Sequence, residues 1–214
     1  MNNPYLNLVF TRSVDGDHAA LERWYSDHIG ILWRCDALHR ATLLRRDVGV
    51  AHEADYICCY AFADEAGFLR YEHGDARKAA HSVIVHGWGR DGITITERRQ
   101  FRRAWSRRTD LCSAPAHHTV WCLRLGAGPW DDVSRWLVDR VHILLQGPAH
   151  SATLMRATDA GEHGGDVLLW AGSDRPLGSS LDWLNAPVAN PVGHVPLTEL
   201  RWHWAGQVVS DWQR

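Results

Sequence analysis

Hydrophobic and polar positions divide the first hundred residues into strand-like and helix-like segments. Tyr5 to Thr11 (YLNLVFT) is rich in strand-forming residues. After Asp17, which can cap a helix, apolar and aromatic positions form one helical stripe at Leu21, Trp24, Tyr25, His28 and Leu32. Strand patterns follow at residues 39–46 and 56–62, then a helical stretch at 65–85 and a strand at 93–101. The predicted order of elements is βαββαβ.

The same order returns in the second half of the chain. His39 to Arg45 (HRATLLR) recurs as His150 to Arg156 (HSATLMR), 111 residues later. Three further matches keep the same order: Arg23-Trp24 with Arg135-Trp136, Asp55 with Asp166, and Thr96-Glu97 with Thr198-Glu199. The second half accordingly predicts strands at 119–125, 152–155, 167–171 and 197–204, and helices after Pro129 and near 180–184. Ordered matches of this kind indicate an internal duplication.

This duplication predicts the fold class. A βαββαβ unit forms a four-stranded antiparallel sheet with both helices on one face, and its other apolar face must be covered. Two units in one chain can cover each other. We therefore predict an α+β protein in which two tandem ferredoxin-like units pack their antiparallel sheets into an intramolecular α+β barrel. The predicted boundaries are 1–105 for the first unit, 106–116 for a linker and 117–214 for the second, diverged unit.

Composition and charge narrow the classes of partner. The chain has 214 residues, 23 Lys plus Arg against 25 Asp plus Glu, and 45% hydrophobic residues. This balance is typical of a soluble globular protein and disfavours binding to nucleic acid through bulk charge. Six arginines between residues 98 and 108 are interpreted as a solvated strand edge that discourages pairing with other sheets. No stretch has the length of a membrane span or the pattern of a signal peptide, so we expect no membrane partner and a cytoplasmic location.

Cysteines and short motifs exclude several chemistries. The five cysteines include no CxxC pair, which predicts buried, unreactive thiols in a reducing compartment. No GxGxxG, P-loop or GxSxG motif occurs, so nicotinamide, nucleoside triphosphate and serine hydrolase mechanisms lose support. We predict no organic cofactor and no metal site. A CxxCH heme attachment is absent too, although a noncovalent heme held by one of the 14 histidines stays open.

Three segments of the first half together resemble a known superfamily. They are Glu22 to Ile29 (ERWYSDHI) with Leu32, then Arg40-Ala41-Thr42, then Tyr56 to Tyr60. These residues are similar to those of the dimeric α+β barrel superfamily, in the EthD and antibiotic-biosynthesis monooxygenase groups, here as a fused tandem. The resemblance implies a pocket between the helices and the sheet of one unit. Its members include cofactor-independent oxygenases, polyketide cyclases, lactone isomerases, dehydratases, decarboxylases and heme proteins such as chlorite dismutases, among which a fold alone does not choose.

His28 is the leading catalytic candidate. It lies on the apolar stripe of the first helix, where a partly buried imidazole can transfer a proton, and Tyr25 one turn earlier can assist it. His81 or His86 would supply a second acid or base. Trp24, Leu32 and Tyr60 are the predicted substrate-binding residues of the same unit. The alternative is a structural histidine whose ring nitrogens are satisfied by the backbone.

The second half offers different candidates. With Trp24 aligned to Trp136, Arg140 takes the place of His28, and it would bind a carboxylate or enolate or form a plain salt bridge. Trp202 and Trp204 share one face of the last strand, where they would stack on an aromatic substrate or fill the core. We expect one working site, in the first unit.

The sequence thus predicts a cofactor-independent cyclase, isomerase or lyase that uses histidine general acid/base catalysis on a hydrophobic aromatic or polyketide-like molecule. Three alternatives stay open: a heme-binding enzyme of the same fold, a cofactor-independent monooxygenase, and a noncatalytic small-molecule-binding protein. The two repeats would form a pseudo-dimer within one chain, and a further homodimer is left open.

Overall fold

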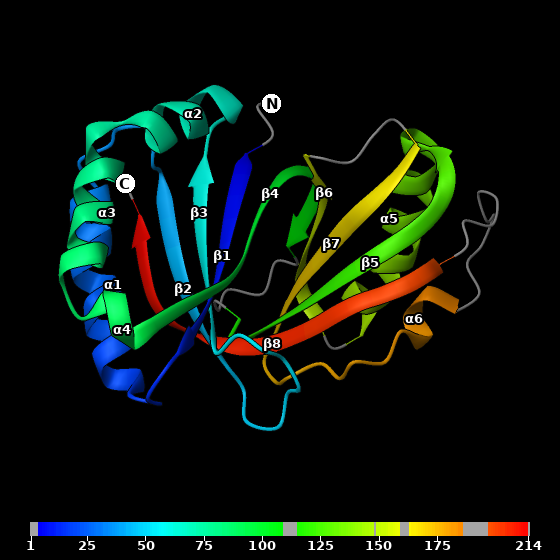
Figure 1. Cartoon of the computed structure of the whole chain (residues 1–214). Helices are drawn as coiled ribbons and strands as arrows, with labels where there is room; N and C mark the ends of the chain where they lie inside the picture. The colour runs from blue at the N-terminus through cyan, green and yellow to red at the C-terminus, as the bar shows by residue number, and fades with distance from the viewer. Residues whose placement is uncertain (1–3, 109–114, 148, 159–162, 186–196, 214) are drawn as a thin grey trace. The chain divides into compact units, whose positions relative to one another are not determined.

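The computed structural model describes residues 4–108, 115–147, 149–158, 163–185 and 197–213 (Figure 1). Its helices and strands follow one another in the order β1 (Tyr5–Ser13), α1 (His18–Leu32), β2 (Arg40–Arg46), β3 (Tyr56–Phe62), α2 (Glu65–His73), α3 (Asp75–His86), α4 (Gly89–Gly92), β4 (Ile93–Arg108), β5 (His117–Pro129), α5 (Trp130–Gln146), β6 (Ala149–Ala157), β7 (His163–Ser173), α6 (Asp182–Asn185) and β8 (Leu197–Gln213). They divide into two compact units, each with its own apolar core.

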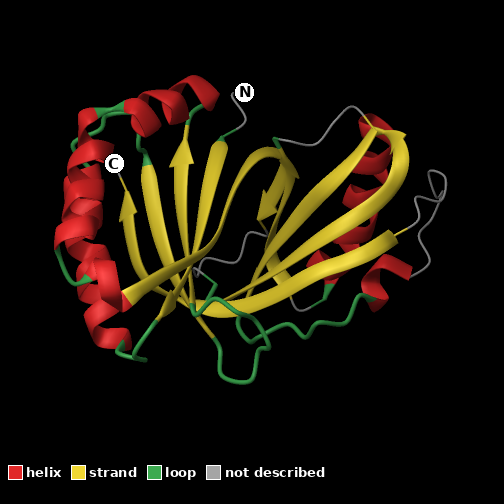
Figure 2. Cartoon of the chain, viewed as in Figure 1, coloured by secondary structure: helices red, strands yellow, loops and turns green. Residues whose placement is uncertain are grey.

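Unit 1 consists of residues 1–46, 53–100 and 208–214. In its sheet, β3 pairs antiparallel with both β1 and β2. Helix α1 begins where the Asp17 carboxylate accepts a hydrogen bond from the Ala20 amide at 2.9 Å, as the sequence predicts. Its buried side chains are those of the predicted stripe, except that Ile29 replaces Trp24 among them. Figure 2 shows the helices of this unit on one side of its strands.

A group of charged hydrogen bonds, called the clasp below, joins β2 to the end of β8. The guanidinium of Arg40 on β2 donates to both carboxylate oxygens of Asp211 on β8, at 2.8 and 2.9 Å. Thr42 donates to the same carboxylate at 2.8 Å. Paired, two-pronged hydrogen bonds of this kind fix geometry as well as adding attraction. The end of β8 therefore belongs to the sheet of unit 1.

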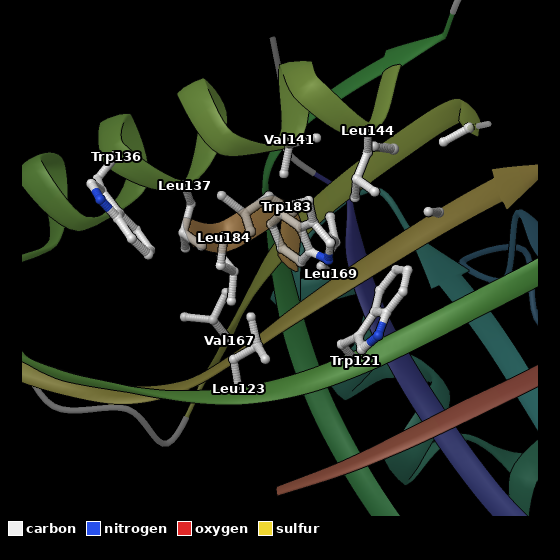
Figure 3. Close-up of a cluster of buried hydrophobic side chains, with 14 of the residues drawn as sticks. Trp121, Leu123, Trp136, Leu137, Val141, Leu144, Val167, Leu169, Trp183 and Leu184 are labelled. Carbon is white, nitrogen blue, oxygen red and sulfur yellow. The ribbon is translucent and has the colours of Figure 1, made fainter. Parts of the chain in front are cut away.

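Unit 2 consists of residues 47–52 and 101–207. Strand β5 pairs antiparallel with β7 and β8, and β6 pairs with β7 and β4. Helix α5 follows Pro129, as predicted, and buries Val133, Trp136, Leu137, Val141 and Leu144. This stripe packs into the core shown in Figure 3, together with side chains of β5, β7 and α6. The repeated order of elements in the two units agrees with the predicted duplication.

The fold class predicted from the sequence is confirmed. The strands of the described chain follow the hydrogen-bonded order β1-β3-β2-β8-β5-β7-β6-β4, which closes as an antiparallel barrel. Strands β4 and β8 each contribute residues to both units. The chain is thus an α+β protein with two ferredoxin-like repeats and an intramolecular barrel.

Some elements differ from their predicted extent. The helical stretch at 65–85 is broken at Gly74, whose extended backbone ends α2, and α3 begins at Asp75. A Cβ atom on Gly74 would lie 2.6 Å from the Arg70 carbonyl oxygen, so the turn requires glycine. Strand β4 continues past residue 101 to Arg108 because β6 pairs with it throughout that stretch. The interpretation of the arginine-rich segment as an unpaired edge is therefore wrong, and residues 109–114 of the predicted linker lie outside the described residues.

The thiols agree with their predicted burial. Cys58, Cys59 and Cys122 are buried, Cys35 is partly buried, and none of these four forms a disulfide among the described residues; Cys112 lies outside the described residues. Burial raises the pKa of the Cys59 thiol to about 12 and that of Cys58 further, so neither forms a thiolate readily. Among the described residues, no helix combines the length and the apolar character that crossing a membrane requires.

Candidate active site

Unit 1 contains a cavity of about 330 Å³ between its helices and its sheet. The walls are mainly apolar and aromatic, and they include Val9, Trp24, Tyr25, Tyr60, Tyr71, Ile84, Ile93 and Ile95. The polar and charged lining side chains are Asn7, Thr11, His28, Arg77, Arg90 and Arg98. An apolar pocket of this size with a few convergent polar groups is the usual form of a small-molecule site.

His28 is the only imidazole among the lining residues that the structure describes. Its side chain is buried, and its ring stacks on that of Trp24 with centroids 4.6 Å apart and an interplanar angle of 16°. Burial lowers the pKa of His28 to about 4, and the positive charges of Arg77 and Arg98 add to this effect. Its Nδ1 atom is buried and has no hydrogen-bond partner among the described residues. His28 is therefore a neutral imidazole at pH 7 with one ring nitrogen unsatisfied by protein groups.

Tyr25 supplies a fixed hydroxyl beside His28. Its ring stands edge-on to the imidazole with centroids 6.5 Å apart, and its hydroxyl is 3.1 Å from the hydroxyl of Thr11. Burial raises the pKa of Tyr25 well above its usual value, and the same holds for Tyr60. These phenols consequently remain neutral hydrogen-bonding groups rather than nucleophiles or bases.

Three arginines give the cavity a positive potential. Arg77 is the most enclosed, with a side chain 12% exposed, and its Nε atom lies 3.7 Å from a carboxylate oxygen of Glu72. Arg90 on α4 and Arg98 on β4 are more exposed. Among the described residues that line the cavity, none is an aspartate or a glutamate. The cavity therefore favours an anion, or a molecule that becomes one during reaction.

The predicted site residues separate into two groups. Trp24, Tyr25, His28 and Tyr60 line the cavity, whereas Leu32 is fully buried in the core of the same unit and does not line it. The remaining candidates lie elsewhere, on the outer face of α3 and in unit 2.

His81 and His86 do not reach the cavity lining. Both lie on α3 with exposed side chains, and the Nδ1 atom of His86 is 2.8 Å from the carbonyl oxygen of Ser82, on its own helix. Arg77 and Ile84 are the residues of α3 that line the cavity. The imidazole of His28 is thus without a second histidine among the lining residues.

Arg140, Trp202 and Trp204 belong to unit 2. The guanidinium carbon of Arg140 lies 5.5 Å from the centre of the Trp136 ring on the same helix, a cation–π contact. Trp204 is fully buried, and Trp202 is partly buried with its ring edge-on to His52 at 5.5 Å. These contacts are typical of core and surface packing within unit 2.

Sequence reasoning missed Asn7, Thr11 and the three arginines. Asn7 and Thr11 alternate with Val9 on β1, so that all three face the cavity. Polar residues at every second position of an otherwise apolar strand were the available signal. Arg77 and Arg98 carried no such signal, because arginines on helices and strands more often face solvent.

The register of the sheets shows what unit 2 has in place of this cavity. Asp55 and Asp166 are equivalent positions of the repeat. Val9 pairs with the third residue after Asp55, and Trp121 pairs with the third residue after Asp166. Trp121 therefore occupies the position at which Val9 lines the cavity of unit 1.

Large side chains fill this region of unit 2. Trp121 is 1% exposed, and its ring centroid lies 5.9 Å from that of Trp183 on α6. Figure 3 shows both tryptophans in this core. Leu123, two residues along β5, corresponds to Thr11 and is fully buried. Tryptophan and leucine thus replace a small apolar residue and a hydroxyl, and the hollow of about 410 Å³ that Trp121 and Trp183 border has a different lining from the cavity of unit 1.

The backbone of Gly89 lies very close to the side chain of Trp24 in the wall of the cavity. A Cβ atom on this residue would lie 2.7 Å from Nε1 and 2.9 Å from Cε2 of Trp24, which is in turn stacked on His28. Gly89→Ala is therefore expected to displace Trp24 and to lower the free energy of unfolding by about 1 to 3 kcal/mol, measured by urea denaturation. Gly30→Ala on α1 is the matched control because a Cβ there meets open space, and it should be neutral or stabilising. Equal effects of the two substitutions would contradict this assignment.

The pKa of His28 also predicts a pH dependence of stability. Its folded pKa of about 4 is below its usual value of 6.5, so between these pH values the unfolded chain binds a proton that the folded chain does not. The neutral imidazole therefore contributes stability that is present above pH 6.5 and is lost as the pH falls towards 4. From pH 7 to pH 5, the wild type should lose about 2 kcal/mol more than His28→Gln in chemical denaturation. Parallel losses in the two proteins would show that His28 is not held neutral.

Comparisons with solved structures support the fold over the whole chain. The "putative monooxygenase" of Fusobacterium nucleatum subsp. nucleatum ATCC 25586 is similar over 99% of this chain and 95% of its own, with a TM-score of 0.61 and 10% identity. An anthrone oxidase-like protein matches 100% of this chain and 94% of its own (TM-score 0.60, 12% identity). A point mutant of chlorite dismutase from Candidatus Nitrospira defluvii matches 98% and 93% (TM-score 0.59, 10% identity). The sequence matches no family model, and no curated protein matches it either.

The chain therefore has the fold of the dimeric α+β barrel proteins in tandem form. This confirms, at the level of the fold, the resemblance indicated by the helix around His28. At about 10% identity these neighbours define architecture alone, so the chemistry must be argued from the cavity.

A heme bound in either hollow would need a histidine to ligate its iron. A histidine that ligates iron normally donates its other ring N–H to a carboxylate, a carbonyl or a water, which fixes the ring. The Nδ1 atom of His28 is buried without such a partner in the part of the chain that the structure describes. A separate hollow in unit 2, of about 410 Å³, has no histidine among its lining residues. Among the described residues, neither hollow thus shows a histidine whose second ring nitrogen is held by a protein group.

Proposed function

We propose that the protein is a cofactor-independent monooxygenase that acts on a flat aromatic molecule with an acidic C–H or O–H group. One observation carries this proposal: a neutral, unsatisfied imidazole faces an apolar cavity whose charged groups are all arginines. Such a site binds a hydrophobic molecule and stabilises the anion formed when that molecule loses a proton.

His28 would act as the base. Its pKa of about 4 makes the imidazole a weak base while the cavity holds no anion, since burial in the first place, and two arginine charges in addition, oppose its protonation. An anion formed in the cavity would offset those charges and pair with the imidazolium, so the proton affinity of His28 rises during the transfer itself. Substrates whose conjugate bases are delocalised over fused rings satisfy this requirement best.

Arg77 and Tyr25 would support the anion. The guanidinium of Arg77 is enclosed and charged, and it is held near Glu72. The hydroxyl of Tyr25 is fixed by Thr11 and remains neutral. Trp24 and Tyr60 would contact the faces and edges of the bound rings. Together these groups position the substrate, hold the charge and keep water from the reacting carbon.

The oxidation step balances without a cofactor. A methylene group between two aromatic rings gives up a proton to His28, and the resulting carbanion transfers electrons to O₂. One oxygen atom enters the product as a carbonyl and the other leaves as water, which completes a four-electron oxidation of the carbon and a four-electron reduction of O₂. Two proteins of similar fold, an anthrone oxidase-like protein and a putative monooxygenase, carry names that describe oxidation. These names favour oxygenation over the cyclase, isomerase or lyase reaction that the sequence suggests.

Oxygen uptake with anthrone tests the proposal directly. The purified protein should consume one O₂ for each anthraquinone formed, at a rate proportional to protein concentration and above the uncatalysed rate. Conversion of the substrate without O₂ uptake would replace the monooxygenase with an isomerase or a lyase. Ligand-dependent thermal stabilisation with no product would indicate a binding protein, and a Soret band in the protein as purified would indicate a heme enzyme.

A further inference from the structure

The arginines in the cavity of unit 1 bear on the charge of the substrate, in an inference that rests on the proposed function and extends it. We propose that the cavity of unit 1 takes an aromatic carboxylic acid whose carboxylate is bound by Arg90 and Arg98. These two arginines are distinct from Arg77, which is more enclosed and lies near Glu72.

The charge of the cavity lining is the first support. Of the described residues in this lining, three carry guanidinium groups and none carries a carboxylate. Arg90 and Arg98 have no salt bridge to any described residue, although each lies on the wall of an otherwise apolar cavity. Cationic groups gathered in this way repel one another, and a bound anion would remove that repulsion. The arrangement therefore selects ligands by charge as well as by shape.

The difference in solvent exposure between His28 and the two arginines is the second support for a carboxylate ligand. His28 is buried, whereas Arg90 and Arg98 are exposed residues on α4 and β4. The aromatic walls and the buried imidazole suit the ring system, and the exposed arginines suit a group that keeps part of its hydration. His28 supplies an independent pointer to a ligand, because its buried Nδ1 atom has no partner among the described residues. One molecule with an acidic ring group and a carboxylate would therefore engage both the imidazole and the exposed arginines.

A carboxylate is the anion that the arginines match best. The guanidinium group presents parallel N–H donors in a plane, and a carboxylate accepts two of them at once. An inner cavity of about 330 Å³ with aromatic walls leaves the rings as the main source of contact area. The ligand class is therefore a flat aromatic acid rather than an inorganic anion.

Calorimetric titration of two isosteric probes tests the inference without turnover. 2-Naphthoate and 2-naphthamide share one ring system and differ in charge. The wild type should bind 2-naphthoate about 10-fold more tightly than 2-naphthamide. Arg98→Gln and Arg90→Gln should each reduce this preference while leaving the affinity for the amide nearly unchanged. Arg23→Gln is the matched control, because Arg23 is an exposed residue of α1 that does not line the cavity.

The outcomes separate this inference from the proposed function. A preference for the acid that falls in both cavity variants and persists in Arg23→Gln supports a carboxylate site, whether or not anthrone is oxidised. Equal affinities for acid and amide, no binding of 2-naphthoate, or a preference that survives both cavity substitutions would overturn it. Failure of the proposed function would instead appear as an absence of O₂ uptake.

Discussion

Replacing His28 with glutamine is expected to lower kcat for anthrone oxidation by about 10²- to 10⁴-fold, the usual contribution of a positioned general base. Glutamine keeps a polar side chain of similar length but cannot accept a proton near neutral pH. The decisive measurement is the initial rate of O₂ uptake at saturating substrate, compared with that of the wild type. KM should change less than kcat, because the arginines and aromatic walls that hold the substrate remain.

The control for this experiment is His39→Gln. His39 is exposed, and it does not line the cavity. It should keep the wild-type rate, which separates loss of the base from a general effect of losing a histidine. If folded His28→Gln kept the wild-type rate, His28 would be a structural residue and the proton would be removed by another group.

Replacing Trp121 with alanine is expected to lower the free energy of unfolding by about 3 to 5 kcal/mol, the range for truncating a large buried aromatic side chain. Trp121 is 1% exposed and contacts Trp183 within the core of unit 2. The neighbouring strands and α5 restrict how far this core can collapse, so most of the volume would remain as a void. Urea denaturation followed by far-UV circular dichroism measures the effect.

The equivalent position of unit 1 provides the comparison. Val9→Ala removes less apolar surface from a residue that already faces a cavity, so the expected loss is about 1 to 2 kcal/mol. A loss for Trp121→Ala as small as that for Val9→Ala would show that the tryptophan core of unit 2 is loosely packed. The contrast tests the conclusion that Trp121 supports the core of unit 2 more strongly than Val9 supports that of unit 1.

The fold was predictable because it repeats. The stripe that contains Tyr25 and His28 has the period of a helix buried on one face, and the helix forms there with the predicted cap at Asp17. The matched segments around His39 and His150 then showed that the same order of elements occurs twice, so each half of the chain supported the prediction for the other. The break at Gly74 was less accessible, since the residues on both sides of it continue a helical pattern.

The candidate site was predictable only in part. Trp24, Tyr25 and His28 come from one helix, so a single periodic pattern brings them together. Arg77 and Arg98 enter through tertiary packing of α3 and β4, which no local period reveals. On α3, Ala80 is buried and the next residue, His81, is exposed. The sequence pattern did not locate the buried face of this helix to within one residue, so it did not show that His81 faces outward.

The clasp between Arg40 and Asp211 has a consequence for biosynthesis. Residues 208–214 belong to unit 1, although all of unit 2 except residues 47–52 is translated between them and the first hundred residues. The sheet of unit 1 is therefore completed only after Asp211 has left the ribosome, when its carboxylate can meet Arg40 and Thr42. The first repeat is therefore without the end of β8 for as long as the second repeat is being made.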